Sequence, residues 1–198
     1  MTEISAKQIA ELRAKTGIGM MECKKALVEA GGDENKAMEI LKKAGALKAM
    51  KRADRETNAG IIESYVHSDG RIGVLVEVLA ETDFVAKNDE FRAFAHDVAL
   101  HIAAMNPRFV SKDQVPAAEV EKERADFVDE VVKSGKPKEI ARKIVEGKLA
   151  KYLDEICLLN QPFVKDPSMT INDLLTEKIS KIGEKIIISR FCRFEIGN

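Results

Sequence analysis

Early in the chain the spacing of the apolar residues changes, and this change limits the folds that the chain can adopt. Before the change, apolar residues such as Ala37, Ile40 and Ala44 recur every three or four positions, which is the spacing along one face of a helix. After it, residues 61–67 and 72–79 follow the two-residue period of a strand. The sequence therefore predicts a helical region followed by a region that begins with a sheet.

Three short helices are predicted in the first region. Ser5 begins the first, and Gln8 has the spacing that a reciprocal capping box requires. The second covers residues 20–30 and ends at Gly31-Gly32, a strong signal for the end of a helix. Asp33 is a suitable cap for the third. Helices of this length make a minimal bundle with a small core.

Residues 48–59 mark a predicted domain boundary, because they carry few large apolar side chains. Two interpretations of this segment stay open: it extends the third helix, or it forms a mobile tether. We predict that residues 1–53 form a three-helix, partner-binding domain and that residues 54–198 form a larger core and dimerisation domain.

The larger domain begins with a hairpin, because Ser68-Asp69-Gly70 stands between the two alternating runs. The segments predicted after it are helices over residues 91–105, from Pro116 to Gly135, from Pro137 to about Ile156 and from Thr170 to about Ile182, a loop beginning at Asn160, and a strand over residues 186–196. A hairpin and one distant strand suggest a three-stranded antiparallel sheet with helices covering one face. The predicted fold class is α+β.

The composition indicates a globular protein with almost no net charge. Apolar residues make up 45% of the 198 residues and charged residues 33%, and 32 basic against 33 acidic residues leave a net charge of -1. Binding nucleic acid by bulk charge needs many uncompensated Lys and Arg residues, so we expect no direct nucleic-acid partner. The apolar runs are shorter than the roughly 20 residues of a membrane span. We expect a cytoplasmic protein with no membrane partner.

The sequence indicates no metal site, no cofactor and no catalytic group. Cys23, Cys157 and Cys192 are widely spaced and form no CxxC pair. His96 and His101 are five positions apart and would point to different faces of a helix. Neither a phosphate-binding GxxxxGK[ST] loop nor a nucleophile elbow occurs. We therefore expect a binding protein and not an enzyme.

Met20 and Met21 are the first unusual feature, at the start of the second helix. Neighbouring residues on a helix point about 100° apart, so both cannot face the core of a small bundle. We expect one of them to be exposed, and exposed Met suits an adaptable protein contact. The alternative is that both seal the bundle where a loop meets the helix.

The second unusual feature is Phe84, in the segment 81–87 that joins the second strand to the next helix. Such connections are exposed, and binding groups concentrate there. The alternative is a structural turn in which Thr82 and Asp83 hydrogen-bond the backbone while Phe84 packs inward.

At these two segments the sequence resembles the bacterial elongation factor Ts family. The matching segments are Leu12-Arg13, Thr16-Gly17, Met20-Met21 and Cys23 to Leu27, then Thr82 to Lys87, Ser134 to Ala141, Gln161 to Val164 and Arg193-Phe194-Glu195. The resemblance implies a ubiquitin-associated-like first domain and an α+β dimerisation domain. It also implies binding to elongation factor Tu in its GDP-bound and nucleotide-free forms, faster GDP release, and displacement of the factor as GTP enters.

The resemblance also implies which residues touch the partner. Thr82, Asp83, Phe84 and Val85 would reach the magnesium region of elongation factor Tu, with Phe84 inserted between partner side chains. Displacing the groups around magnesium weakens both the ion and the nucleotide, because magnesium demands near-ideal octahedral geometry.

A second contact is implied for the amino-terminal domain. There Arg13, Met20, Met21 and Lys24 would hold the nucleotide-binding domain of the partner.

Many members of this family are longer and carry a duplicated core, whereas this chain has one core unit. Residues 71–76 and 101–107 resemble the second repeat, and His101 is thereby a candidate second contact. One core unit would then make the contacts of both repeats, which suggests a two-fold homodimer. The closing strand would lie at the dimer interface with Cys192 near its symmetry mate; the alternative is a buried, reduced thiol.

Two other functions are alternatives. One is an interaction module that binds without promoting exchange. The other is RNA binding through the basic residues Lys42, Lys43, Lys48, Lys51, Arg52 and Arg55. The chain has no Trp and only two Tyr for base stacking, so these charges more readily line a solvated tether.

Overall fold

The structure is a computed structural model that describes residues 4–132 and 137–197. The helix end predicted at Gly135, and the part of the family resemblance over residues 134–136, lie outside the described residues. The contacts divide the chain into two compact units. Unit 1 comprises residues 1–62, 77–95 and 173–187, and unit 2 comprises residues 63–76, 96–172 and 188–198.

The three predicted amino-terminal helices are confirmed and lie in unit 1. They are α1 (Ala6–Thr16), α2 (Met20–Glu29) and α3 (Glu34–Lys51). Ser5 and Gln8 form the predicted capping box, and the Asp33 side chain caps α3. Because α3 continues to Lys51, it includes the first residues of the 48–59 segment, and the residues from 52 to 58 form turns and irregular structure.

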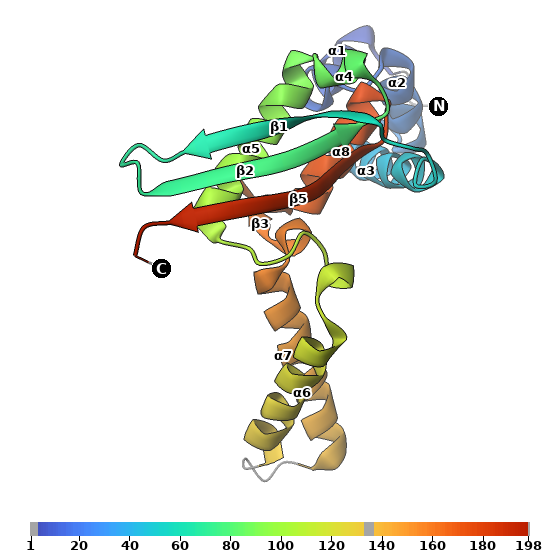
Figure 1. The fold of residues 1–198 in the computed structure, drawn as a ribbon. Coiled ribbons are helices and arrows are strands. Elements are labelled where there is room, and N and C mark those ends of the chain that lie inside the picture. The colour runs from blue at the N-terminus through green and yellow to red at the C-terminus, as the bar shows by residue number, and fades with distance from the viewer. Residues whose placement is uncertain (1–3, 133–136, 198) are drawn as a thin grey trace. The chain divides into compact units, whose positions relative to one another are not determined.

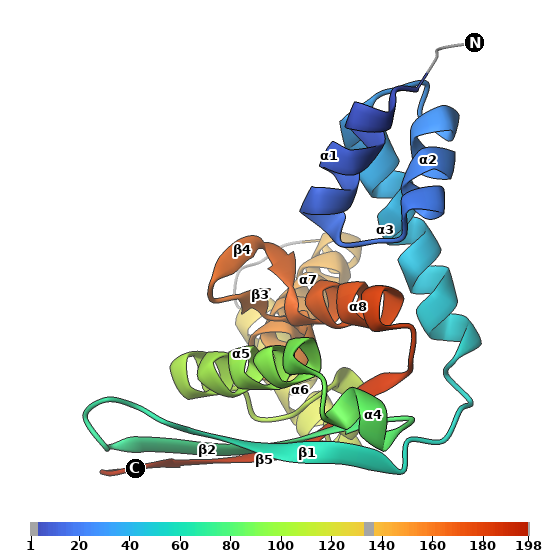
Figure 2. The same cartoon turned by 90° about the horizontal axis from the view of Figure 1, so that it is seen from above.

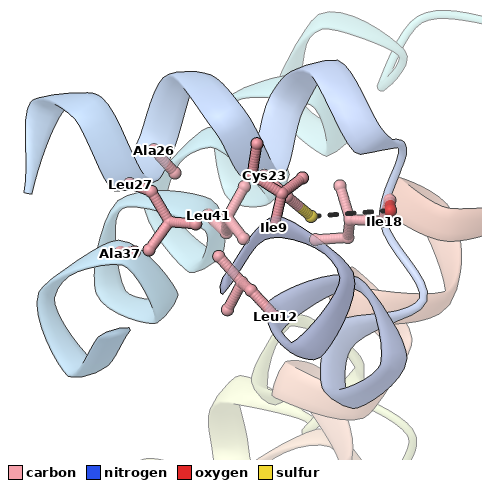
Figure 3. Close-up of a cluster of buried hydrophobic side chains, with 8 residues drawn as sticks. All are labelled: Ile9, Leu12, Ile18, Cys23, Ala26, Leu27, Ala37 and Leu41. Carbon is pink, nitrogen blue, oxygen red and sulfur yellow. Dashed lines mark hydrogen bonds between the residues drawn. The ribbon is translucent and has the colours of Figure 1, made fainter. Parts of the chain in front are cut away.

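The core of this bundle is small and apolar (Figure 3). Its buried residues are Ile9, Leu12, Ile18, Cys23, Ala26, Leu27, Ala37 and Leu41. The thiol of Cys23 donates a hydrogen bond to the carbonyl of Ile18 over 3.6 Å, the dashed line in Figure 3. This bond ties α2 to the loop that follows α1, where Gly17 takes a left-handed conformation with a φ of 67°.

The predicted three-stranded antiparallel sheet is confirmed. Its strands β1 (Ala59–Val66), β2 (Ile72–Ala80) and β5 (Ile186–Glu195) lie in the order β1-β2-β5, and neighbouring arrows run in opposite directions in Figure 1. The hairpin closes where the His67 amide donates to the Ile72 carbonyl over 2.9 Å. The Ile196 amide donates to the Arg71 carbonyl, also over 2.9 Å, and joins the end of β5 to the start of β2.

Among the described residues, helices cover one face of this sheet and leave the other uncovered. Helices α5 (Asp89–Met105) and α8 (Ile171–Ile182) lie on the same side of the strands in Figure 2. Alternation in β2 agrees with this, because Val74 and Val76 are buried whereas Leu75 between them is exposed. The helix predicted to end at Asn106-Pro107 ends at Met105, as expected.

Two long helices of unit 2 do not cover the sheet. Helices α6 (Ala117–Val132) and α7 (Lys138–Ile156) pack on each other and extend away from the strands of unit 2 in Figure 1. Ion pairs join them, including Arg124 with Glu146 and Lys148 with Glu130. The expected covering role is therefore wrong for this pair, because the apolar face of each helix is occupied by the other.

The loop predicted from Asn160 contains a second, two-stranded sheet. Strands β3 (Pro162–Phe163) and β4 (Asp166–Thr170) pair antiparallel, after the short helix η2 (Leu158–Asn160). A further short helix, η1 (Lys112–Gln114), lies before α6. The strands were missed because β3 is too short to show a two-residue period.

His101 is buried and forms hydrogen bonds to the residues on either side of β3. Its side chain is fully buried on α5, its Nε2 donates to Gln161 Oε1 over 2.9 Å, and its Nδ1 accepts from the Val164 amide over 3.2 Å. Because Nδ1 accepts a hydrogen bond, it carries no proton, and the imidazole is neutral. Burial lowers the pKa of His101, and the hydrogen bond to Gln161 opposes this only in part. As the chain is folded here, His101 has no exposed atoms with which to touch a partner, contrary to its selection as a candidate second contact.

No helix within the described ranges 4–132 and 137–197 combines the length and the apolar character needed to cross a bilayer.

The buried, neutral His101 predicts that acid weakens the fold. The unfolded imidazole has a pKa of about 6.5, whereas the folded one takes up its proton only at lower pH. Above about pH 6.5 this group should therefore not lower the free energy of unfolding. Below that pH, protonation of the unfolded imidazole should lower the free energy of unfolding by at most about 1.4 kcal/mol per pH unit. Urea unfolding at several pH values measures the slope.

The matched comparison uses two histidine variants. His101→Gln should remove part of the acid slope, whereas His67→Gln, at an exposed site, should keep it. Equal slopes in the parent chain and in His101→Gln would contradict the assignment.

Candidate functional site

Phe84 stands out from the surface of unit 1. It lies on the four-residue helix α4 (Asp83–Ala86), which begins three residues after the end of β2, and its side chain is 88% exposed. Ala86 is the residue of α4 that is buried. The alternative in which Phe84 packs inward is therefore wrong: the turn is anchored by a methyl group, and the ring points outward.

The backbone of this turn is satisfied locally. The hydroxyl of Thr82 accepts from the Val85 amide over 3.5 Å, and the amides of Ala86 and Lys87 donate to the carbonyls of Thr82 and Asp83 over 3.2 Å each. The Thr82 part of the structural alternative is thus correct, although its prediction for Phe84 is not. The Asp83 side chain is exposed beside Phe84.

Glu81 precedes the turn, and its side chain contacts two other segments of unit 1. Its carboxylate accepts from the Lys185 amide over 2.6 Å and from the Arg55 guanidinium over 3.0 Å. The Lys185 amide is the main cause that lowers the pKa of Glu81; burial opposes it, and Arg55 adds to the lowering. Glu81 is therefore ionised at neutral pH, and the end of β2 is fixed to the start of β5.

Met20 and Met21 form a second exposed feature of unit 1. Their side chains are 53% and 65% exposed, while Cys23 one turn later is buried. The prediction that one of the two would be exposed was too cautious, and the alternative in which both seal the bundle is wrong. Lys24 and Arg13 are exposed as well.

The predicted partner-binding residues thus occupy two separate sets of elements. One set is α4, with residues 82–85, and the other is the end of α1 and the start of α2, with Arg13, Met20, Met21 and Lys24. The chemistry of both is that of a contact surface. Among the described residues, no cluster of three or more His, Cys, Asp or Glu side chains has the geometry of a metal site.

Cys192 is a free, exposed thiol on β5, so its interpretation as a buried thiol is wrong. The reason is the orientation of its neighbour. The guanidinium of Arg193 donates to the Ala103 carbonyl of α5 over 3.2 Å, so Arg193 faces the helices. Because successive side chains of a strand point to opposite faces, Cys192 and Phe194 face away from them.

The sheet face opposite the helices carries an apolar patch in unit 2 that the sequence analysis did not identify. We call it the open face, and it consists of Val66, Leu75, Cys192, Phe194 and Ile196. Phe194 is 70% exposed. Tyr65 supports the assignment, because its ring contacts His96 of α5 with centroids 5.9 Å apart, which turns the adjacent Val66 the other way.

The basic residues considered for RNA binding are partly engaged within the chain. Lys48 forms an ion pair with Glu22, and Arg55 forms one with Glu81. The charges of these two side chains are thereby partly neutralised.

Comparison with known proteins identifies the family of the chain. A family model described as "Elongation factor TS" matches residues 5–198. The chain is 54% identical over 194 residues to "Elongation factor Ts" of Acetivibrio thermocellus, and 56% identical over 194 residues to the protein of that name from Alkaliphilus metalliredigens. Each alignment covers 98% of this chain and 90% of the relative. The chain belongs to the elongation factor Ts family.

Elongation factor Ts proteins of similar length exist. The relative from Thermodesulfovibrio yellowstonii is 51% identical over 194 residues, and the alignment covers 98% of this chain and 96% of the relative. This member of a family of translation elongation factors is therefore close to this chain in length.

The exposure of Phe84 predicts that removing its ring leaves the stability of the chain intact. Phe84→Ala should change the free energy of unfolding by no more than about 0.5 kcal/mol, because the ring buries almost no area. Phe94→Ala on α5, where the ring is fully buried, should cost about 3–5 kcal/mol. Urea unfolding measures both, and an equal loss in the two variants would show that Phe84 is packed in solution.

Proposed function

We propose that this chain is a guanine nucleotide exchange factor for elongation factor Tu. It binds the GDP-bound form, disturbs the magnesium site and promotes GDP release so that GTP can bind. The observation that carries the proposal is the 88% exposed Phe84, held on a capped turn within the segment that resembles the family motif. An exposed aromatic side chain on an ordered turn is suited to insertion into another protein.

The proposed mechanism needs no chemical reaction by this chain, so the proposal does not include enzymatic catalysis. Phe84 enters between side chains of the partner, and Asp83 approaches the same region. Because magnesium requires near-ideal octahedral geometry, a small shift of its surroundings weakens the ion and the phosphates that it holds. A buried aromatic anchor of this kind contributes about 2–4 kcal/mol.

The second contact fixes the factor on its partner. Met20 and Met21 offer flexible apolar contacts, and Arg13 and Lys24 add charge beside them. Binding and exchange are coupled: if the factor weakens GDP binding by some ratio, GDP weakens binding of the factor by the same ratio. The factor is thereby released when nucleotide returns.

We also propose that two copies form a homodimer through the open face. Val66, Leu75, Phe194 and Ile196 are apolar and exposed in unit 2, and such a contiguous patch is a typical protein interface. A two-fold axis through β5 would bring Cys192 near its mate. Each copy then supplies an α4 turn. The proposed place of action is the cytoplasm, where translation elongation occurs.

The exchange proposal predicts a large effect of one side chain. A trace amount of the parent chain should accelerate release of a fluorescent GDP analogue from elongation factor Tu. Phe84→Ala should reduce this acceleration at least about tenfold, because the wedge is lost while the fold is kept. Stopped-flow fluorescence measures the release.

Val128→Ala is the matched control, since Val128 is an exposed apolar residue on α6 and lies in none of the segments that resemble the family. An unchanged rate in Phe84→Ala would remove Phe84 from the mechanism. Equal binding of the parent chain to elongation factor Tu with and without GDP would instead favour a module that binds without promoting exchange.

The dimer proposal predicts the mass in solution. Light scattering of the parent chain should give twice the 21.9 kDa of one chain. Phe194→Glu should give the mass of one chain, because a carboxylate at the centre of an apolar interface is poorly solvated. Val132→Glu places the same charge at an exposed site on α6 and should leave the mass unchanged. A parent chain with the mass of one copy would refute the dimer.

A further inference from the structure

Residues from a distant part of the sequence lie beside the turn that carries Phe84. Strands β2 and β5 are antiparallel neighbours, so the end of β2 and the start of β5 meet at one edge of the sheet. Glu184 and Lys185 precede β5, and Glu81 and Thr82 follow β2. All four belong to unit 1.

Glu184 holds Thr82 by two hydrogen bonds. Its Oε2 accepts from the Thr82 amide over 3.1 Å, and its Oε1 accepts from the Thr82 hydroxyl over 2.7 Å. Hydrogen bonds to a carboxylate are roughly twice as strong as those between neutral groups. Because the hydroxyl proton points to Glu184, a lone pair of the same oxygen is left for the Val85 amide, which is the cap of α4.

The reverse connection runs from Lys185 to Glu81. The Lys185 amide donates to Glu81, and the Lys185 ammonium donates to the carbonyls of Ala53 and Arg55 over 2.5 and 2.7 Å. We call Glu81, Thr82, Glu184 and Lys185 the clasp. Each side of the clasp gives a carboxylate to the other side, so both chain segments are held reciprocally.

The α4 turn needs such support, since it is too short to be stable by itself. A single helical turn orders several residues for one or two hydrogen bonds, and its formation is unfavourable in isolation. The exposed ring of Phe84 adds little packing to the turn, Ala86 buries only a methyl group, and Val85 is only half-buried. The polar contacts at Thr82 therefore supply much of what keeps the turn in one conformation.

We propose that Glu184 is a positioning residue for nucleotide exchange, which holds Thr82 and the α4 turn so that Phe84 is presented in one orientation before the partner arrives. This inference rests on the proposed exchange function and deepens it. Ordering a binding element in advance removes that entropic cost from association. Glu184 acts through the turn and needs no contact with the partner.

Loss of the clasp should change one kinetic parameter more than the other. In Glu184→Ala the turn must be ordered during binding, so the factor concentration that gives half-maximal exchange should rise about tenfold. The maximal rate at saturating factor should stay within about twofold, because the bound complex still contains Phe84. Glu184→Gln keeps the size and one acceptor oxygen, and it should show a smaller change in the same direction.

Stopped-flow release of a fluorescent GDP analogue from elongation factor Tu, over a range of factor concentrations, separates the two parameters. Glu177→Ala is the matched control, because Glu177 is a half-buried carboxylate on α8 that the clasp does not include. It should leave both parameters unchanged. Circular dichroism and urea unfolding of each variant establish that the folded fraction is equal.

A double-mutant cycle tests whether Glu184 acts through Phe84. Added to Phe84→Ala, the Glu184→Ala change should alter the half-maximal concentration less than about twofold, because no ring remains to be positioned. An equal loss in the parent and Phe84→Ala backgrounds would overturn the proposal, since Glu184 would then act elsewhere.

Amide hydrogen exchange of the chain alone gives a readout that does not depend on the partner. The Thr82 and Val85 amides should exchange at least about tenfold faster in Glu184→Ala, and at the parent rate in Glu177→Ala. Unchanged protection in Glu184→Ala would overturn the clasp. A parent chain that fails to accelerate GDP release would overturn the exchange function, and with it the positioning role, whatever the protection.

Discussion

The antiparallel pairing of β2 with β5 is the constraint on which the functional surfaces depend. It joins segments that lie far apart in sequence, since Thr82 and Glu184 are 102 positions apart. At one edge of the sheet this pairing brings the clasp together behind α4. Within unit 2 the same two strands carry Leu75 and Phe194 of the open face. A change that shifted the register of β5 would therefore disturb both surfaces, because a slip by one residue turns every side chain to the other face.

Phe84 and Phe194 show two different reasons for exposing an aromatic ring. Phe194 belongs to a patch with Val66, Leu75 and Ile196, and a broad apolar patch on a strand surface suits a flat, self-complementary interface. Phe84 stands on a four-residue turn, with Asp83 exposed beside it. A single projecting ring covers little area but can enter a gap in another protein. The first arrangement favours lasting association, and the second favours a contact that must also be released.

Local signals in the sequence predicted the local structure well, and long-range contacts account for what they missed. The capping box of Ser5 depends on residues three positions apart, so it was visible before the fold. The orientation of Cys192 was not, because Ile188 of β5 is buried whereas Cys192, which a strict two-residue period places on the same face, is exposed. The roles of His101 and Glu184 depend on partners 60 and 102 positions away, Gln161 and Thr82. The pattern of residues along the chain does not predict such pairs.

The use of carboxylates behind Phe84 follows from a conflict in the role that we propose for this ring. Apolar packing is the usual way to fix an aromatic side chain, but packing would bury the ring and remove it from the partner. The turn must instead be fixed through its backbone and its cap, and those groups are hydrogen-bond donors. Glu184 offers two acceptor atoms to the two donors of Thr82, which matches this need without covering Phe84. The half-exposed setting also suits ionised carboxylates, because water still solvates them and little desolvation opposes the contact.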